Sequence, residues 1–328
     1  MTTIFTPLAI YNKPGPLRAL VEQRGFTVEW VTSPNAPKGA GWNEESKKAL
    51  VDRAPEMEFL LINTTPLDKT FFAAAKKLKL VSMFGVGLDH IDIPAATGAG
   101  VLVANAPGAN ARCVAELVFS LMLDLAHKVT QMHTDLVAGA WKPRLGFEIS
   151  GKTLGLIGFG NTARDVARIA RAFGMKVIFA NRTPRPEAAR ELNAEQLPFD
   201  EVLARAEYLS VHVPGGGSWH LGAEQFAKMK KGTYVINTAR GDAMDMDALA
   251  EALAAKHLAG AGLDVFPVEP ADGKHPVFAL PQVVATPHAG GLSAESMARV
   301  TTACLDEVTR VMNRERSPNV RNPEAYSF

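Results

Sequence analysis

The chain has 328 residues and carries 35 basic against 34 acidic side chains; this length predicts two domains, and the charge balance argues against nucleic acid or a membrane surface as partner. No secretory signal pattern and no run of roughly 20 apolar residues occurs, so we expect a cytoplasmic protein that binds a small molecule. The only cysteines, Cys113 and Cys304, are expected to be buried thiols, because a disulfide scaffold or a zinc site needs more cysteines at short spacing.

In the N-terminal third of the chain, short apolar runs alternate with helical patterns. The expected strands are 4–10, 26–31, 59–62, 80–84 and 101–104. Strands separated by helices of this length are joined by right-handed crossovers, so they indicate a parallel sheet.

A long apolar helix is expected over residues 111–129, and its pattern predicts burial on most sides and a position between two domains. The segment that follows, 139–146, contains Trp141 and Pro143 and is expected to form an exposed arm. We hypothesise that the chain forms a homodimer through this region.

A second series of strands begins at residue 153 and indicates a second doubly wound sheet. Its expected strands are 153–157, 176–180, 208–213, 233–237, 260–264 and 283–285, with a helix over 163–173. The final helix, 293–314, is expected to pack on the first domain. The fold class is therefore α/β with two doubly wound parallel-sheet domains, the first made of 1–104 and 292–328 and the second of 105–291.

The strand at 153–157 leads directly into a glycine turn and a helix, as a dinucleotide-binding unit requires. Gly158 permits the tight turn, Gly160 lets the backbone approach a pyrophosphate, and Ala163 allows close contact between helix and strand. The free amides at the start of the helix would bind the phosphates. A glycine turn alone is weak evidence, but here both flanking elements fit.

The end of the next strand bears on the choice of nicotinamide. Sites for NAD usually carry an acidic residue there, which binds the ribose hydroxyls, whereas this chain has Asn181, Arg182 and Thr183. A neutral amide, a guanidinium fork and a hydroxyl suit a 2′-phosphate. NADP(H) is the preferred cofactor on this interpretation, and NAD(H) remains an alternative if Arg182 is only a solvated loop residue.

Three later segments, 235–241, 262–270 and 285–291, each place polar groups after a buried strand, and these contain Arg240, Glu269 and His288. With the segments 85–92 and 105–110, they resemble the D-isomer-specific 2-hydroxyacid dehydrogenase family over nearly the whole chain. The resemblance implies a Rossmann cofactor domain and a flavodoxin-like, discontinuous substrate domain. It also implies the reduction of a small 2-keto acid to a D-2-hydroxy acid, without a metal.

Each residue of the set has a chemical reason to be there. His288 would donate a proton, Glu269 would orient its ring and favour the imidazolium, and Arg240 would bind the substrate carboxylate. Backbone amides around Val86 and Gly87 would hold the other end of the carboxylate. The cofactor-binding residues expected from the turn and from the resemblance are Gly158, Phe159, Gly160, Asn161, Thr162, Asn181, Arg182, Thr183, His212, Val213, Pro214, Ser218, Thr238, Ala239, Asp264, His288 and Gly290.

By the same resemblance, Asp264 would meet the nicotinamide amide and 212–214 would line the cofactor cleft. The chain departs from many relatives at 215–219, where Ser218 is the only hydroxyl available for a pyrophosphate. The strand end at 181–183 is similar to that of NADPH-dependent glyoxylate and hydroxypyruvate reductases. Two alternatives stay open: an enzyme like D-3-phosphoglycerate dehydrogenase, and a non-catalytic, cofactor-sensing protein like the corepressors of this scaffold.

Overall fold

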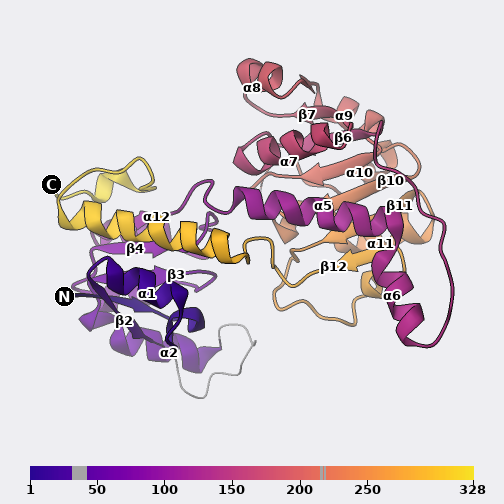
Figure 1. The fold of residues 1–328 in the computed structure, drawn as a ribbon. Coiled ribbons are helices and arrows are strands. Elements are labelled where there is room, and N and C mark those ends of the chain that lie inside the picture. Colours follow the sequence, from indigo (N-terminus) through magenta and orange to yellow (C-terminus); the bar gives the residue numbers. More distant parts are fainter. Residues whose placement is uncertain (32–42, 215–216, 218) are drawn as a thin grey trace. The chain divides into compact units, whose positions relative to one another are not determined.

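The computed structural model describes residues 1–31, 43–214, 217 and 219–328. It divides into two compact units (Figure 1): Met1–Asn110 with Leu292–Phe328, and Ala111–Gly291. Residues 105–110, which the sequence led us to assign to the second domain, belong to the first unit.

The first unit contains a five-stranded sheet in the order β2-β1-β3-β4-β5, with every pair parallel. This is the order of flavodoxin-like folds, so the expected fold class is confirmed for this unit. The strands are β1 (Thr2–Thr6), β2 (Phe26–Trp30), β3 (Phe59–Ile62), β4 (Leu80–Met83) and β5 (Leu102–Ala104), and the helices before the crossing to the second unit are α1 (Pro16–Gln23), α2 (Glu44–Arg53), α3 (Lys69–Ala74) and α4 (Ile93–Gly98).

The first strand is shorter than the predicted range 4–10. It ends at Thr6 because Pro7 has no amide hydrogen to continue the ladder, and a 3-10 turn, Ala9–Tyr11, follows.

The C-terminal helix α12 (Ala294–Met312) belongs to the first unit. Val300, Cys304 and Leu305 of this helix are buried in the same core as Ile4 of β1 and Leu80 of β4, and Figure 1 shows α12 running beside β4. Burial raises the pKa of the Cys304 thiol to about 12, so this cysteine is an unreactive core residue.

The prediction of a buried thiol is wrong for Cys113, which is only partly buried. It lies at the edge of the apolar stripe of its helix, whose neighbours Val114 and Ala115 occupy the buried face.

The second unit contains a seven-stranded sheet in the order β12-β11-β10-β9-β6-β7-β8, again with every pair parallel. This is the dinucleotide-binding order 3-2-1-4-5-6 with β12 added at one end, which confirms the expected Rossmann fold. The strands are β6 (Thr153–Ile157), β7 (Lys176–Ala180), β8 (Ala194–Gln196), β9 (Tyr208–Val211), β10 (Thr233–Asn237), β11 (Leu258–Leu263) and β12 (Val283–Ala285).

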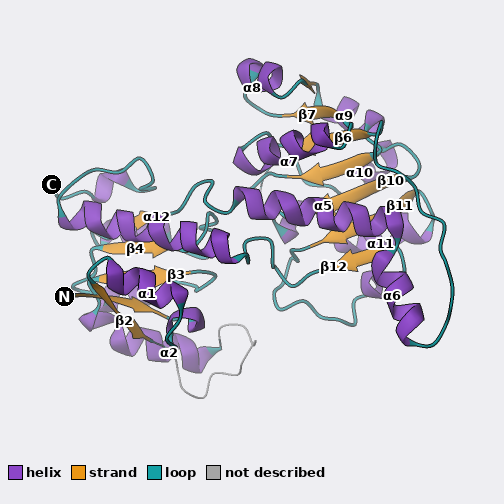
Figure 2. Ribbon diagram, in the orientation of Figure 1, coloured by secondary structure: helices purple, strands orange, loops and turns teal. Residues whose placement is uncertain are grey.

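Helices cover both faces of this sheet (Figure 2). The long apolar helix is α5 (Ala111–His127), which packs beside α7 (Asn161–Ala172) in a core that includes Val118, Met122 and Val166. The other helices are α6 (Val129–Val137), α8 (Pro186–Glu191), α9 (Phe199–Arg205), α10 (Ala223–Lys228) and α11 (Met246–Ala254).

The predicted helix 111–129 is in fact interrupted at Lys128, whose φ of 58° is left-handed. The segment after α6 is exposed, with Trp141 at 86% and Leu145 at 91% of their full surface. Within the described ranges, no helix is long and apolar enough to cross a membrane.

Candidate active site

The glycine turn after β6 is built around a close approach between two strand ends. Gly158 has a φ of +91°, and a Cβ at this position would lie 2.6 Å from the carbonyl oxygen of His212, the residue after β9. A side chain would therefore meet both an unfavourable backbone conformation and a clash. Glycine is required here because of the contact with the neighbouring strand.

Gly160 has the opposite environment. A Cβ at Gly160 would meet no atom within 4 Å, so the turn leaves open space beside its backbone. The helix α7 starts at Asn161 without a side-chain cap on its first amides, and its dipole presents a positive end to the same space. Ala163 is fully buried in the core behind it. These features fit the pyrophosphate of a dinucleotide, with Asn161 and Thr162 at the helix start.

Two predicted cofactor residues have partners inside the protein. The ring of Phe159 is buried and stacks on Phe179 at 3.7 Å between centroids. The Phe159 amide donates to Oδ1 of Asn181 at 3.0 Å, while Nδ2 of Asn181 donates to the carbonyl of Thr183 at 2.6 Å. Asn181 thus ties the glycine turn to the end of β7.

The end of β7 presents positive charge to solvent. Arg182 and Thr183 are exposed, and no acidic residue occurs in the stretch 181–186. Among the residues that the structure describes, Arg182 has no ion-pair partner. A guanidinium in this state can bind a phosphate without first leaving a carboxylate.

His288 and Glu269 form a close pair. Nδ1 of His288 lies 2.6 Å from Oε2 of Glu269, and the amide of Phe266 donates to the other carboxylate oxygen at 3.0 Å. The hydrogen bond to Glu269 outweighs burial and, with the charges of Glu269 and Asp264, raises the pKa of His288 above its ordinary value, although Arg240 opposes this. Burial opposes ionisation of Glu269, but the His288 and Phe266 hydrogen bonds and the charges of His288 and Arg240 lower its pKa.

The backbone of His288 is held in a left-handed conformation, with a φ of 51°, which is rare outside glycine. Its amide donates to the carbonyl oxygen of Asp264 at 2.8 Å. The buried carboxylate of Asp264 accepts from the Thr286 hydroxyl at 2.6 Å and from the amides of Ala289 and Gly290 at 2.7 and 2.9 Å. Asp264, expected at the nicotinamide, therefore makes these three contacts to the loop that carries His288.

Arg240 follows β10 in a segment whose backbone is held by hydrogen bonds to the side chain of Asn237. The buried side chain of Asn237 donates to the carbonyl of Arg240 at 2.8 Å and accepts from the amide of Ala239 at 3.1 Å. A Cβ on Gly241 would lie 1.9 Å from the carbonyl carbon of Phe266, so the two segments touch backbone to backbone. Asn237 and Gly241, which position Arg240, were not predicted from the sequence. The only sequence signal for them is that a glycine directly follows Arg240.

The other predicted cofactor residues lie near the carboxyl ends of β9 and β10. The hydroxyl of Thr238 is buried without a hydrogen-bond partner in the described structure, which suits a polar group of a bound ligand. Nε2 of His212 lies 2.9 Å from the Ser210 hydroxyl, and burial lowers the pKa of His212 to about 4, so this ring is neutral at physiological pH. Val213 is half-buried and Pro214 is exposed, whereas Ser218 lies outside the described residues.

In the first unit, the predicted substrate loop follows β4. The amides of Val86 and Gly87 donate to no acceptor among the described residues, so they can bind a carboxylate. The carbonyl of Val86 accepts from Nδ2 of Asn105 at 2.7 Å, and Nε of Arg321 donates to Oδ1 of Asn105 at 2.9 Å. Arg321, near the C-terminus, was not predicted because its role depends on a contact distant in sequence.

The comparisons with known proteins identify the family of this chain. The family model described as D-isomer specific 2-hydroxyacid dehydrogenase, NAD binding domain, matches residues 119–290. A glyoxylate reductase of Korarchaeum cryptofilum is 34% identical over 86% of this chain and 89% of its own length. A D-3-phosphoglycerate dehydrogenase of Mycobacterium leprae is 38% identical over 90% of this chain but only 54% of its own length.

Among solved structures, a protein of Thermus thermophilus has a TM-score of 0.84 and 33% identity, with 98% of this chain and 100% of the other covered. The predicted family is thereby confirmed. The chain belongs to the D-isomer specific 2-hydroxyacid dehydrogenase family and is an oxidoreductase that uses a nicotinamide cofactor.

Proposed function

We propose that this enzyme reduces a small 2-keto acid of the glyoxylate or hydroxypyruvate type to the D-2-hydroxy acid, with NADPH as the preferred donor. The observation that carries the proposal is the pair of His288 and Glu269 at 2.6 Å, because the carboxylate stabilises the protonated imidazole that serves as proton donor. The similarity to a glyoxylate reductase along most of both chains supports the substrate class.

The roles of the residues follow from their chemistry. When bound, the nicotinamide supplies the hydride that reduces the carbonyl carbon. Since Nδ1 of His288 is engaged by Glu269, Nε2 donates the proton to the carbonyl oxygen. Arg240 binds the substrate carboxylate and polarises the carbonyl through its planar set of donors. The amides of Val86 and Gly87 bind the carboxylate from the loop after β4.

Steady-state kinetics with glyoxylate, hydroxypyruvate and pyruvate, each with NADPH and NADH, test this function. We expect the highest kcat/KM for one of the first two acids with NADPH. The absence of turnover with every 2-keto acid would exclude it. Faster oxidation of D-3-phosphoglycerate with NAD⁺ would favour the alternative suggested by the Mycobacterium leprae relative.

A variant of His288 distinguishes an enzymatic role of this protein from a role as a non-catalytic cofactor sensor. His288→Asn is the suitable variant because asparagine tolerates the left-handed backbone at this position. An enzyme loses most of its turnover in this variant and keeps its affinity for NADPH. A protein whose biological activity survives the substitution would be a sensor.

The preference for NADPH is assigned to Arg182 and Thr183. A hydrogen bond to a charged group contributes roughly 1.5–3 kcal/mol, so Arg182→Ala is expected to lower the NADPH to NADH ratio of kcat/KM about tenfold or more. Arg190→Ala is the matched control, since Arg190 is an exposed arginine on α8. An unchanged ratio in Arg182→Ala would refute the assignment.

We also propose a homodimer formed through α6 and the following arm. Val137, Trp141 and Leu145 expose 75%, 86% and 91% of their surface, and apolar side chains gathered on one segment mark an interaction site. Sedimentation equilibrium is expected to give the mass of two chains, and Leu145→Glu is expected to shift it toward one. A monomeric parent protein would refute this proposal.

A further inference from the structure

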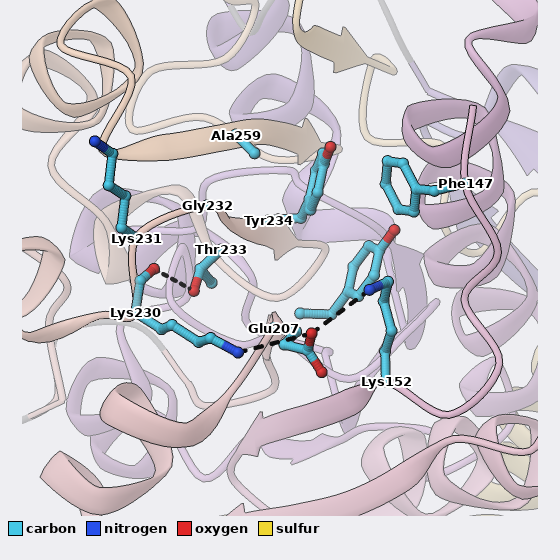
Figure 3. Close-up of a pocket in the computed structure, with 10 residues that line it drawn as sticks. Phe147, Lys152, Glu207, Lys230, Lys231, Gly232, Thr233, Tyr234 and Ala259 are labelled. Atoms are coloured by element: carbon cyan, nitrogen blue, oxygen red, sulfur yellow. Dashed lines mark hydrogen bonds and ion pairs between the residues drawn. The ribbon is translucent and has the colours of Figure 1, made fainter. Parts of the chain in front are cut away.

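A cavity of about 200 Å³ lies in the second unit, lined by residues at the amino ends of its strands (Figure 3). Lys152 precedes β6, Glu207 precedes β9, and Lys230 and Lys231 precede β10. All strands of this sheet are parallel, so these residues occupy the edge opposite the glycine turn and Arg240. The cavity is therefore separate from the site described above.

One wall of the cavity is aromatic. The rings of Tyr208 and Tyr234 stack at 5.0 Å with an angle of 19° between their planes, and Phe147 lies 5.3 Å from Tyr234. A cavity of about 150 Å³ can hold benzene, so the space here accepts one six-membered ring with a small substituent. A flat ligand would gain offset stacking against this wall.

The hydroxyl of Tyr208 is an unmet hydrogen-bonding group in this wall. Tyr208 is fully buried, and its hydroxyl has no partner in the part of the chain that the structure describes. Leaving a buried hydroxyl unpaired is unfavourable, and such groups are rare in native proteins. Burial raises the pKa of Tyr208, with smaller contributions from Tyr234 and Glu207, so the hydroxyl stays protonated and can donate a hydrogen bond to an oxygen atom of a ligand.

The rim of the cavity carries excess positive charge. Figure 3 shows the side chains of Lys152 and Lys230 extending toward Glu207, whose Oε1 lies 3.5 and 3.8 Å from their ammonium groups. Burial opposes ionisation of Glu207, but the amide of Thr153 and the two lysines lower its pKa, so it is charged. Lys231 has no ion-pair partner among the described residues. Lys152 and Lys230 thus flank one carboxylate, and Lys231, which lines the same cavity, adds a third positive charge, so the rim as a whole attracts an anion.

We propose that this cavity is a second ligand site, for a small aromatic carboxylate. The ring lies against Phe147 and Tyr234, the carboxylate is attracted by the lysines of the rim, and the Tyr208 hydroxyl donates to an oxygen atom of the ligand. This site is independent of the proposed substrate and cofactor, because it is built from the opposite ends of the strands.

Isothermal titration calorimetry of the full chain with benzoate tests the proposal, with acetate and benzyl alcohol as probes that lack the ring or the charge. We expect benzoate to bind with the same Kd in the absence and presence of saturating NADPH. Acetate and benzyl alcohol are expected to bind at least about tenfold more weakly, since each loses one set of contacts. No benzoate binding at millimolar concentrations would overturn the proposal, as would displacement of benzoate by NADPH.

Four variants locate the binding. Tyr208→Phe and Lys231→Ala are each expected to weaken benzoate binding about three- to tenfold, whereas Arg240→Ala and the distant control Lys48→Ala leave it unchanged. The thermal midpoint of Tyr208→Phe is expected to equal or exceed that of the parent, because the change removes an unpaired buried hydroxyl. Loss of binding in Arg240→Ala with full binding in Tyr208→Phe would place benzoate in the substrate site and overturn the proposal.

Discussion

Replacing Glu269 by glutamine is the most direct test of the proton donor. The carboxylate accepts a hydrogen bond from Nδ1 of His288 at 2.6 Å and from the Phe266 amide at 3.0 Å. A glutamine keeps the shape of the side chain and one carbonyl oxygen, but it removes the charge that stabilises the imidazolium. Its amide group can also donate to Nδ1 of a neutral ring, which favours the unprotonated form.

The size of the effect follows from the exposure of the pair. A hydrogen bond to a charged group is worth roughly 1.5–3 kcal/mol, and the His288 side chain is 44% exposed, so solvent screening favours the low end of that range. About 1.4 kcal/mol corresponds to one pKa unit. We therefore expect Glu269→Gln to lower the pKa of His288, with a change of roughly tenfold in the equilibrium between the neutral ring and the imidazolium.

The assay is the pH dependence of kcat/KM in the direction of keto-acid reduction. Because the reaction needs protonated His288, the rate is full below the pKa of this residue and falls as the pH rises through it. An ordinary histidine has a pKa of about 6.5. Because the pKa of His288 is raised, the rate of the parent enzyme falls at a higher pH than that. Glu269→Gln moves the fall to lower pH, so at a pH above the pKa of His288 in both proteins the rate of the variant is about tenfold lower.

Glu201→Gln, at an exposed position of helix α9, is the control and leaves the profile in place. A loss that is equal at every pH, with an unmoved profile, would refute the role of Glu269 in proton donation.

Three further variants test the supports of the site. Gly241→Ala forces a Cβ into the Phe266 backbone and is expected to lower kcat/KM by about a hundredfold with NADPH affinity kept; fluorescence titration beside kinetics checks this, and unchanged kinetics would disprove the close contact. Asp264→Asn removes an acceptor of the His288 loop and is expected to lower the unfolding free energy by about 1–3 kcal/mol, measured by urea denaturation; an unchanged midpoint contradicts it. Arg321→Ala frees Asn105 and is expected to raise KM for the keto acid but not for NADPH; equal changes in both would show a general loss of structure.

Much of the fold could be predicted because its strands are buried on both faces. The ranges 59–62, 153–157, 176–180 and 233–237 agree with the structure, since central parallel strands are continuous apolar runs. The edge strand β8 was missed because Ala194–Gln196 has no such run. The break at Lys128 was missed because the apolar pattern continues through it while one residue turns left-handed.

The sequence predicted which residues form the site, but not the hydrogen bonds and backbone contacts that hold them in place. Arg240, Glu269 and His288 could be found because each follows a strand in a recognisable segment. The contacts of Asp264 with the His288 loop, and of Gly241 with Phe266, join segments about 25 residues apart. Their existence depends on the distance between adjacent loops, which no local pattern in the sequence records.

The return of α12 to the first sheet has a consequence for the order of folding. Val300, Cys304 and Leu305 complete the core around β1 and β4, yet they are synthesised almost two hundred residues after Asn110, the last residue of the N-terminal part. The second unit is continuous in sequence and can fold as soon as it emerges, because domains fold as units during synthesis. The first sheet lacks part of its apolar cover until α12 is synthesised, so we expect the nascent N-terminal segment to need protection from aggregation for longer than the second unit.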